Sequence, residues 1–158
     1  MNRRLDLSVQ YTAGRDNLPS RKEILAWARA ALTSEGESRH RGGKIVVRFV
    51  LEKESHKLNL DYRGRDDATN VLSFLYEEVP AICGDLVICT PVVEREAATR
   101  NKALHAHYAH LIVHGLLHLQ GYDHKPSRKM ARVMEDRERS ILQSLGFSDP
   151  YQQVEKRD

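Results

Sequence analysis

The sequence contains few cysteines and no long apolar run. Cys83 and Cys89 are the only cysteines among 158 residues, and their spacing fits neither a C-x-x-C redox pair nor a zinc knuckle. We therefore expect both to be small, buried side chains. No run of about 18 apolar residues is present, which argues against a transmembrane helix and a membrane partner. The opening MNRRLDLSVQYT lacks the continuous apolar core of a signal peptide, so we expect a cytoplasmic protein.

Repeats, low-complexity tracts and linkers are also missing, and we expect one domain over residues 1–158. Hydrophobic residues make up 41% of the chain, which is too many for a disordered protein. The net charge of +3 is a weak indication of an anionic partner. Short basic clusters are either solvated surface or phosphate sites. They are residues 39–44, 62–65 and 125–129.

Apolar periodicity predicts the secondary structure. The expected strands are residues 5–11, 44–51, 70–76 and 81–89. The expected helices are residues 20–32, a short helix that begins near His56, and residues 90–100, 104–119 and 127–146. Ser20 and Glu23 have the spacing of a capping box, and Thr90 is expected to cap a helix before Pro91. Because most strands precede most helices, we expect an α+β fold with a mixed sheet of about four strands and helices packed around it.

Six of the eight histidines lie between residues 105 and 124, so the question is which of them can share one metal ion. On a helix, His110, His114 and His118 recur every four residues along one face. At about 1.5 Å rise per residue, His110 and His118 are about 12 Å apart along the axis, too far for one ion with bonds of about 2.0–2.1 Å. The helical pair is therefore either His110 with His114 or His114 with His118.

The residues after His118 favour the second pair. Gly121 can adopt positive φ and end the helix, so that the chain turns back and brings His124 toward His114 and His118. Three imidazoles without an obvious fourth ligand leave a position for water, as in catalytic metal sites. We expect a metal ion at these three histidines, with zinc preferred, although nickel, copper and iron also suit imidazole ligands.

The other histidines are not expected to bind the metal. His105, His107 and His110 are expected on the helix surface or in contact with a metal ligand. His40 and His56 have no partner at a suitable spacing and are expected to be solvated.

The motif H-x-x-x-H-x-x-G-x-x-H resembles that of the metzincin zinc peptidases, in which a glutamate after the first histidine is the general base. Gly115 stands at that position and cannot transfer a proton through a side chain, so a peptidase would lack its base.

Two residues beside the third histidine have other expected roles. Asp123 either orients an imidazole or caps the turn. Tyr122 is expected to pack against the core.

Three segments resemble the YbeY family of bacterial rRNA maturation factors, described as single-strand-specific endoribonucleases. They are LNLDYRGRDDATNVLSF (58–74), GDLVI (84–88) and HGLLHLQGYDH (114–124), and the resemblance covers nearly the whole chain. It implies a zincin-like metal-binding helix and turn, with one zinc ion per chain at His114, His118 and His124. It also implies that Arg63 and His114 are the catalytic residues. Leu75 departs from the proline of many members, which is expected to alter only a strand end.

The resemblance further implies a function in rRNA maturation, at the 3′ end of 16S rRNA, and in ribosome quality control. The implied partners are single-stranded pre-rRNA, the small ribosomal subunit, a small-subunit ribosomal protein and an Era-like GTPase. Arg63 would bind phosphate and stabilise charge at phosphorus, the alternative being an ion pair with Asp66 or Asp67. The nucleophile is either water or the RNA 2′-hydroxyl. The competing function is a non-catalytic, ribosome-associated RNA-binding factor with a structural zinc.

Overall fold

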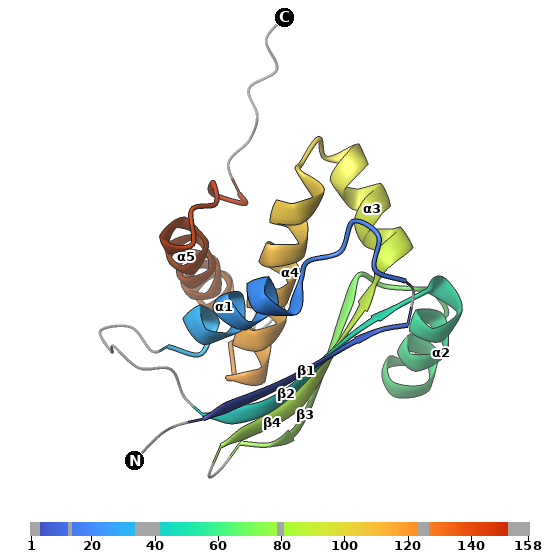
Figure 1. Cartoon of the computed structure of the whole chain (residues 1–158), viewed down its shortest axis with the longest axis horizontal. Helices are drawn as coiled ribbons and strands as arrows, with labels where there is room; N and C mark the ends of the chain where they lie inside the picture. The colour runs from blue at the N-terminus through green and yellow to red at the C-terminus, as the bar shows by residue number, and fades with distance from the viewer. Residues whose placement is uncertain (1–3, 13, 34–41, 79–80, 123–126, 152–158) are drawn as a thin grey trace, which may run out of the picture.

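A four-stranded mixed sheet forms the centre of the molecule (Figure 1). The computed structural model describes residues 4–12, 14–33, 42–78, 81–122 and 127–151. The strands are β1 (Leu5–Tyr11), β2 (Gly43–Val50), β3 (Val71–Glu77) and β4 (Ile82–Cys89). Their order is β1-β2-β4-β3; β1, β2 and β4 are parallel, whereas β3 is antiparallel to β4 and forms an edge of the sheet. The predicted mixed sheet is confirmed.

Five helices lie in the described part of the chain and complete the predicted α+β fold. They are α1 (Arg21–Ala31), α2 (Glu52–Arg63), α3 (Thr90–Thr99), α4 (Leu104–Leu119) and α5 (Arg128–Ser144). Figure 1 shows α1, α4 and α5 over one face of the sheet and α2 over the other. The predicted capping box begins α1, with Ser20 and Glu23 each bonding the other's backbone N–H. None of these helices is long and apolar enough to cross a membrane.

The sheet separates two apolar clusters of unequal size. The larger cluster packs strand residues such as Ile45 and Leu86 against α1, α4 and α5. The smaller cluster contains Leu72 and Val87 with Leu58 of α2. Successive side chains of a strand point to opposite faces, so the neighbours Leu86 and Val87 reach different clusters. Consequently α2 and α4 lie on opposite faces of the sheet.

Two glycines allow α4 to lie close to the sheet. A Cβ atom at Gly84 in β4 would lie 3.0 Å from a terminal methyl carbon of Leu119 in α4. A Cβ atom at Gly115 in α4 would lie 2.7 Å from a terminal methyl carbon of Leu86. The hydroxyl of Ser73 in β3 donates to the Gly115 carbonyl at 3.4 Å. Position 115 therefore faces the packed sheet and has no room for the glutamate that a metzincin carries there.

Two helix boundaries differ from the prediction. α2 begins at Glu52 and has 12 residues, so it is longer than the short helix expected from His56. The acidic Glu52 in its first turn interacts favourably with the helix dipole, which explains the earlier start. α3 begins at Thr90 itself, and Cys89 occupies the cap position without a side-chain hydrogen bond, so the prediction of Thr90 as the cap is wrong.

The two cysteines and the end of β3 follow the predictions in part. Cys89 is buried as expected, whereas Cys83 is only partly buried, and both are free thiols.

The pairing of β3 with β4 becomes irregular between Leu75 and Glu77. The region in which proline is replaced by Leu75 is therefore a strand end with a local register shift.

Candidate metal centre

α4 carries three partly buried histidines, His110, His114 and His118, at successive turns. The rings of His114 and His118 meet edge-on with centroids 4.6 Å apart, whereas the centroids of His110 and His114 are 6.2 Å apart. Side chains at this i, i+4 spacing can chelate one ion. The structure thus brings together two of the three predicted ligands. The third, His124, and the neighbouring Asp123 lie outside the described residues.

The turn after His118 is the predicted one. The Gly121 N–H donates to the His118 carbonyl at 3.0 Å, and the Tyr122 N–H donates to the Leu117 carbonyl at 3.1 Å. Gly121 has a φ of +96°, which glycine adopts without strain, and these features together form a Schellman motif. Tyr122 packs against the core, as expected. The helix therefore ends directly after His118, and the chain changes direction before residue 124.

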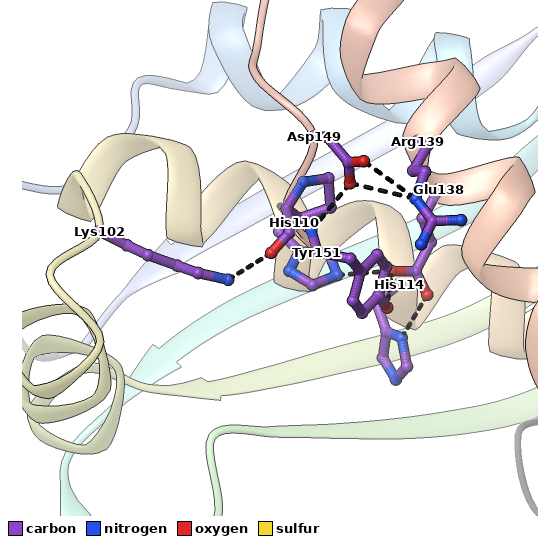
Figure 2. Close-up of polar contacts among 8 residues, drawn as sticks. Lys102, His110, His114, Glu138, Arg139, Asp149 and Tyr151 are labelled. Atoms are coloured by element: carbon purple, nitrogen blue, oxygen red, sulfur yellow. Dashed lines mark hydrogen bonds and ion pairs between the residues drawn. The ribbon is translucent and has the colours of Figure 1, made fainter. Parts of the chain in front are cut away.

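A buried carboxylate from α5 lies beside the histidines of α4 (Figure 2). Glu138 has 0% relative exposure. Its Oε1 is 2.8 Å from Nδ1 of His114, and its Oε2 is 2.5 Å from Nε2 of His110. The hydroxyl of Tyr151 donates to the same Oε2 at 2.6 Å. One side chain therefore connects α4, α5 and the segment that follows α5.

The sequence analysis did not predict this role, because Glu138 lies close to the acidic residues Glu135 and Asp136 and does not stand out from them by charge. The buried side of α5 nevertheless contains Glu138 among apolar residues, namely Met134, Ile141 and Leu142. Along α5 these four residues follow one another at intervals of four, three and one positions, the spacing of a stripe that faces the core. A carboxylate within such a stripe is rarely left unpaired, and this was the available signal.

The charge of Glu138 determines which ring nitrogens carry protons. Burial alone would raise its pKa, but hydrogen bonds and charges from His110 and His114 outweigh burial and lower the pKa to about 2. An ionised carboxylate only accepts hydrogen bonds. Nδ1 of His114 and Nε2 of His110 must therefore be the donors. When neutral, His114 then has its lone pair on Nε2, the nitrogen that faces away from Glu138.

His110, His114 and Glu138 form a cluster that could itself hold a metal ion. Their ligand atoms lie within 4.8 Å of one another. The two nitrogen–oxygen distances of 2.5 and 2.8 Å are hydrogen-bond distances, however. Ligand atoms around a tetrahedral zinc are about 3.3 Å apart, given bonds of about 2.0–2.1 Å. The present geometry is therefore that of a carboxylate which supports two histidines.

His107 corrects one prediction, because it lies in the interior and not on the helix surface. Its relative exposure is 2%, and it faces the space between α3 and α4. Nε2 of His107 is 3.0 Å from Oε1 of Glu96, which also accepts from the side-chain amide of Asn70 at 3.1 Å. This carboxylate–histidine pair resembles the one between Glu138 and His114, but it does not involve a predicted metal ligand.

The other histidines are on the surface or outside the described ranges. His105 is exposed as predicted and lies 2.7 Å from a carboxylate oxygen of Glu23. His56 is also exposed, as expected, and it pairs with the exposed Asp66 at 2.6 Å. His56 and Asp66 are ten positions apart and come together because the chain folds back after α2. His40 lies outside the described residues.

Burial of His107 predicts a dependence of stability on pH. Burial lowers its pKa below the ordinary value of 6.5, and Glu96 only partly offsets this effect. The unfolded chain thus binds the proton more readily, so this contribution to stability is present above pH 6.5 and is lost as the pH falls through the folded-state pKa. Between about pH 7.5 and about pH 5, we expect wild type to lose more unfolding free energy than His107→Gln in urea titrations. Equal losses in both proteins would contradict this account, and His105→Gln is the exposed control.

Arg63 is exposed in the last turn of α2, before Gly64 ends the helix with φ of 69°. Its neighbour Tyr62 packs edge-on against Phe74 of β3, with ring centroids 5.3 Å apart. No hydrogen bond or ion pair joins Arg63 to His114 in the part of the chain that the structure describes. Arg63 is the last residue of α2 and His114 belongs to α4, and these two helices pack on opposite faces of the sheet.

Neither nearby aspartate neutralises Arg63 within the described ranges. Asp66 pairs with His56, as noted above. Asp67 accepts a hydrogen bond from the side-chain amide of Asn59 at 3.0 Å. Both carboxylates thus have other partners, and the guanidinium of Arg63 forms no ion pair with either of them in the described structure.

Comparison with known proteins identifies the family. The family model described as Endoribonuclease YbeY matches residues 10–146. A relative of that name from Methylobacillus flagellatus is 48% identical over 94% of both chains, and one from Paracidovorax citrulli is 49% identical over 93% of this chain and 95% of the relative. The solution structure of TM1509 from Thermotoga maritima is similar with a TM-score of 0.56 at 25% identity, covering 92% of this chain and 99% of that one. The chain therefore belongs to the YbeY family.

Proposed function

We propose that this chain is a zinc-dependent endoribonuclease that cleaves single-stranded RNA during rRNA maturation. Family membership supports RNA cleavage as the activity. The observation that carries the proposal is the pair of adjacent imidazoles, His114 and His118, directly before the turn at Gly121. The proposed substrate is pre-rRNA, at the 3′ end of 16S rRNA, with a further role in ribosome quality control. The proposed partners in the cytoplasm are the small ribosomal subunit, a small-subunit protein and an Era-like GTPase.

The donor set of the proposed site suits zinc. His114, His118 and His124 would hold one ion per chain, and catalytic zinc sites commonly have three protein ligands. The hydrogen bond from Nδ1 of His114 to Glu138 agrees with this assignment, because it leaves the imidazole lone pair on Nε2. When bound, zinc supplies Lewis-acid activation of water or of a phosphoryl oxygen.

Arg63 supplies a cation for the phosphodiester. Its planar guanidinium can form two parallel hydrogen bonds to phosphate oxygens and stabilise charge that develops there. Arg63 ends α2 and His114 belongs to α4, and because these helices pack on opposite faces of the sheet, the proposed path of the RNA runs around the edge at β3. A flexible single strand can follow such a path more easily than a regular A-form duplex. This geometry supports the proposed preference for single-stranded RNA.

Removal of the metal tests the proposed function. We expect purified protein to cleave a single-stranded RNA oligonucleotide, to lose this activity after chelation and dialysis, and to recover it when zinc is restored. The ends of the products then identify the nucleophile. A 2′,3′-cyclic phosphate requires attack by the RNA 2′-hydroxyl, whereas direct attack by water leaves no cyclic end.

Two results would contradict the proposal. Cleavage that survives complete removal of the metal would show that zinc is not required. If the metal-loaded protein binds pre-rRNA or small subunits but does not cleave them, the non-catalytic RNA-binding factor with a structural zinc is the better description. Metal content must be measured on each sample so that these outcomes can be distinguished.

A further inference from the structure

The segment after α5 is held against α4 and α5 by several polar contacts (Figure 2). Both carboxylate oxygens of Asp149 lie 3.1 Å from Nε of Arg139, and Asp149 also accepts from the backbone N–H of Tyr151 at 2.8 Å. Nζ of Lys102 donates to the carbonyl of Pro150 at 2.7 Å. The guanidinium of Arg139 lies 5.1 Å from the centre of the Tyr151 ring. Each contact constrains the position of Tyr151.

Tyr151 in turn constrains the orientation of Glu138. Its hydroxyl donates to Oε2 of Glu138, the oxygen that also contacts His110. The Tyr151 ring packs edge-on against the His110 ring, with centroids 5.4 Å apart. With Oε2 held by two donors, the carboxylate cannot rotate freely, and Oε1 stays directed at Nδ1 of His114.

We propose that Glu138 is a positioning residue that fixes the tautomer and orientation of His114 for metal binding, and that Tyr151 holds Glu138 in this role. The inference rests on the proposed function, in which His114 is a zinc ligand. A carboxylate that accepts from one imidazole nitrogen directs the other nitrogen to the metal and makes it more basic. In the proposed site Glu138 and Tyr151 are not ligands, so their effect on zinc binding would pass through His114.

A second carboxylate–histidine pair, between Glu96 of α3 and His107 of α4, provides a control. Glu96 contacts Nε2 of the buried His107, which the proposed site does not include. Glu138→Gln and Glu96→Gln therefore remove the same charge from a similar carboxylate–histidine contact on α4. A purely structural role of Glu138 predicts a loss of stability in Glu138→Gln and no effect on zinc affinity from either substitution.

Zinc affinity, measured by competition with a chromophoric chelator, tests the proposal on the full-length protein. Glu138→Gln is expected to weaken zinc binding by about 10- to 100-fold. Tyr151→Phe, which leaves Glu138 in place, is expected to weaken it by about threefold to tenfold. Glu96→Gln is expected to bind zinc within about twofold of wild type. In metal-free wild type, proton–nitrogen correlation spectra should show His114 protonated on Nδ1, and Glu138→Gln should reduce that population.

The outcomes separate this inference from the proposed function. If His114→Ala loses zinc but Glu138→Gln and Tyr151→Phe bind it as tightly as wild type, the positioning role is wrong while the site stands. If His114→Ala keeps its zinc, the proposed site itself is wrong. If Glu138→Gln does not fold, the zinc affinity of Tyr151→Phe and the spectra of metal-free wild type still test the positioning role. A proton on Nε2 of His114 in those spectra would overturn the inference. Complete loss of zinc in Glu138→Gln but not in His118→Ala would make Glu138 a ligand and overturn it too.

Discussion

The His118→Ala variant is expected to lose its zinc and about 10³-fold or more of its RNA-cleavage rate, while its fold is retained. A metal ion contributes several kcal/mol to the stabilisation of transition-state charge, and each 1.36 kcal/mol corresponds to about tenfold in rate. His118 is only partly buried in the last turn of α4, so truncation leaves no large cavity in the core. Zinc content by elemental analysis and cleavage of a labelled single-stranded RNA measure the two effects.

His105→Ala is the control for this prediction. His105 belongs to the same helix and is exposed, with a carboxylate of Glu23 as its partner. We expect this variant to keep wild-type zinc content and a cleavage rate within about twofold, as is usual for a surface site. A His118→Ala protein that contains no zinc but cleaves as fast as wild type would indicate a contaminating nuclease and would contradict the proposed function.

The Arg63→Ala variant is expected to lower kcat for RNA cleavage by about 10²- to 10³-fold, the usual effect of removing one group that stabilises transition-state charge. Zinc content should not change, because Arg63 is not one of the proposed ligands. Arg63 is exposed at the end of α2, and no ion pair with Asp66 or Asp67 is lost within the described residues. Folding stability should therefore change by less than about 0.5 kcal/mol. Single-turnover cleavage and urea unfolding test these expectations.

Arg65→Ala and Arg63→Lys separate a specific role from general attraction to RNA. Arg65 is exposed in the same basic cluster, so its removal subtracts the same charge near the same place. We expect Arg65→Ala to weaken RNA binding modestly and to reduce its salt dependence, with little change in kcat. Arg63→Lys keeps the charge but not the bidentate geometry and should remain well below wild type. Equal losses of kcat in Arg63→Ala and Arg65→Ala would reduce Arg63 to a general electrostatic contact.

Local sequence signals account for the features that were predicted correctly. The capping box of Ser20 and Glu23 and the positive φ of Gly121 each depend on a few consecutive residues. The strands of the sheet follow from alternating or continuous apolar runs of ordinary length. The pairing of His114 with His118 follows from helical spacing together with the turn at Gly121.

The features that were missed depend on contacts between distant elements. The partners of Glu138 come from α4 and from the segment after α5, and the partner of His107 comes from α3. Helical periodicity indicates which face a residue occupies, but it does not identify the side chain opposite to it. Local sequence signals likewise do not indicate that α2 packs on the face of the sheet opposite to α4.

Zinc stoichiometry in four histidine variants tests the central claim most directly. The variants are His110→Ala, His114→Ala, His118→Ala and His124→Ala, each purified under the same conditions and checked for folding by circular dichroism. Ligation by His114, His118 and His124 predicts that only His110→Ala retains about one zinc ion per chain. A protein that loses zinc in His110→Ala and keeps it in His118→Ala and His124→Ala would instead bind the metal at His110, His114 and Glu138, and would contradict the account.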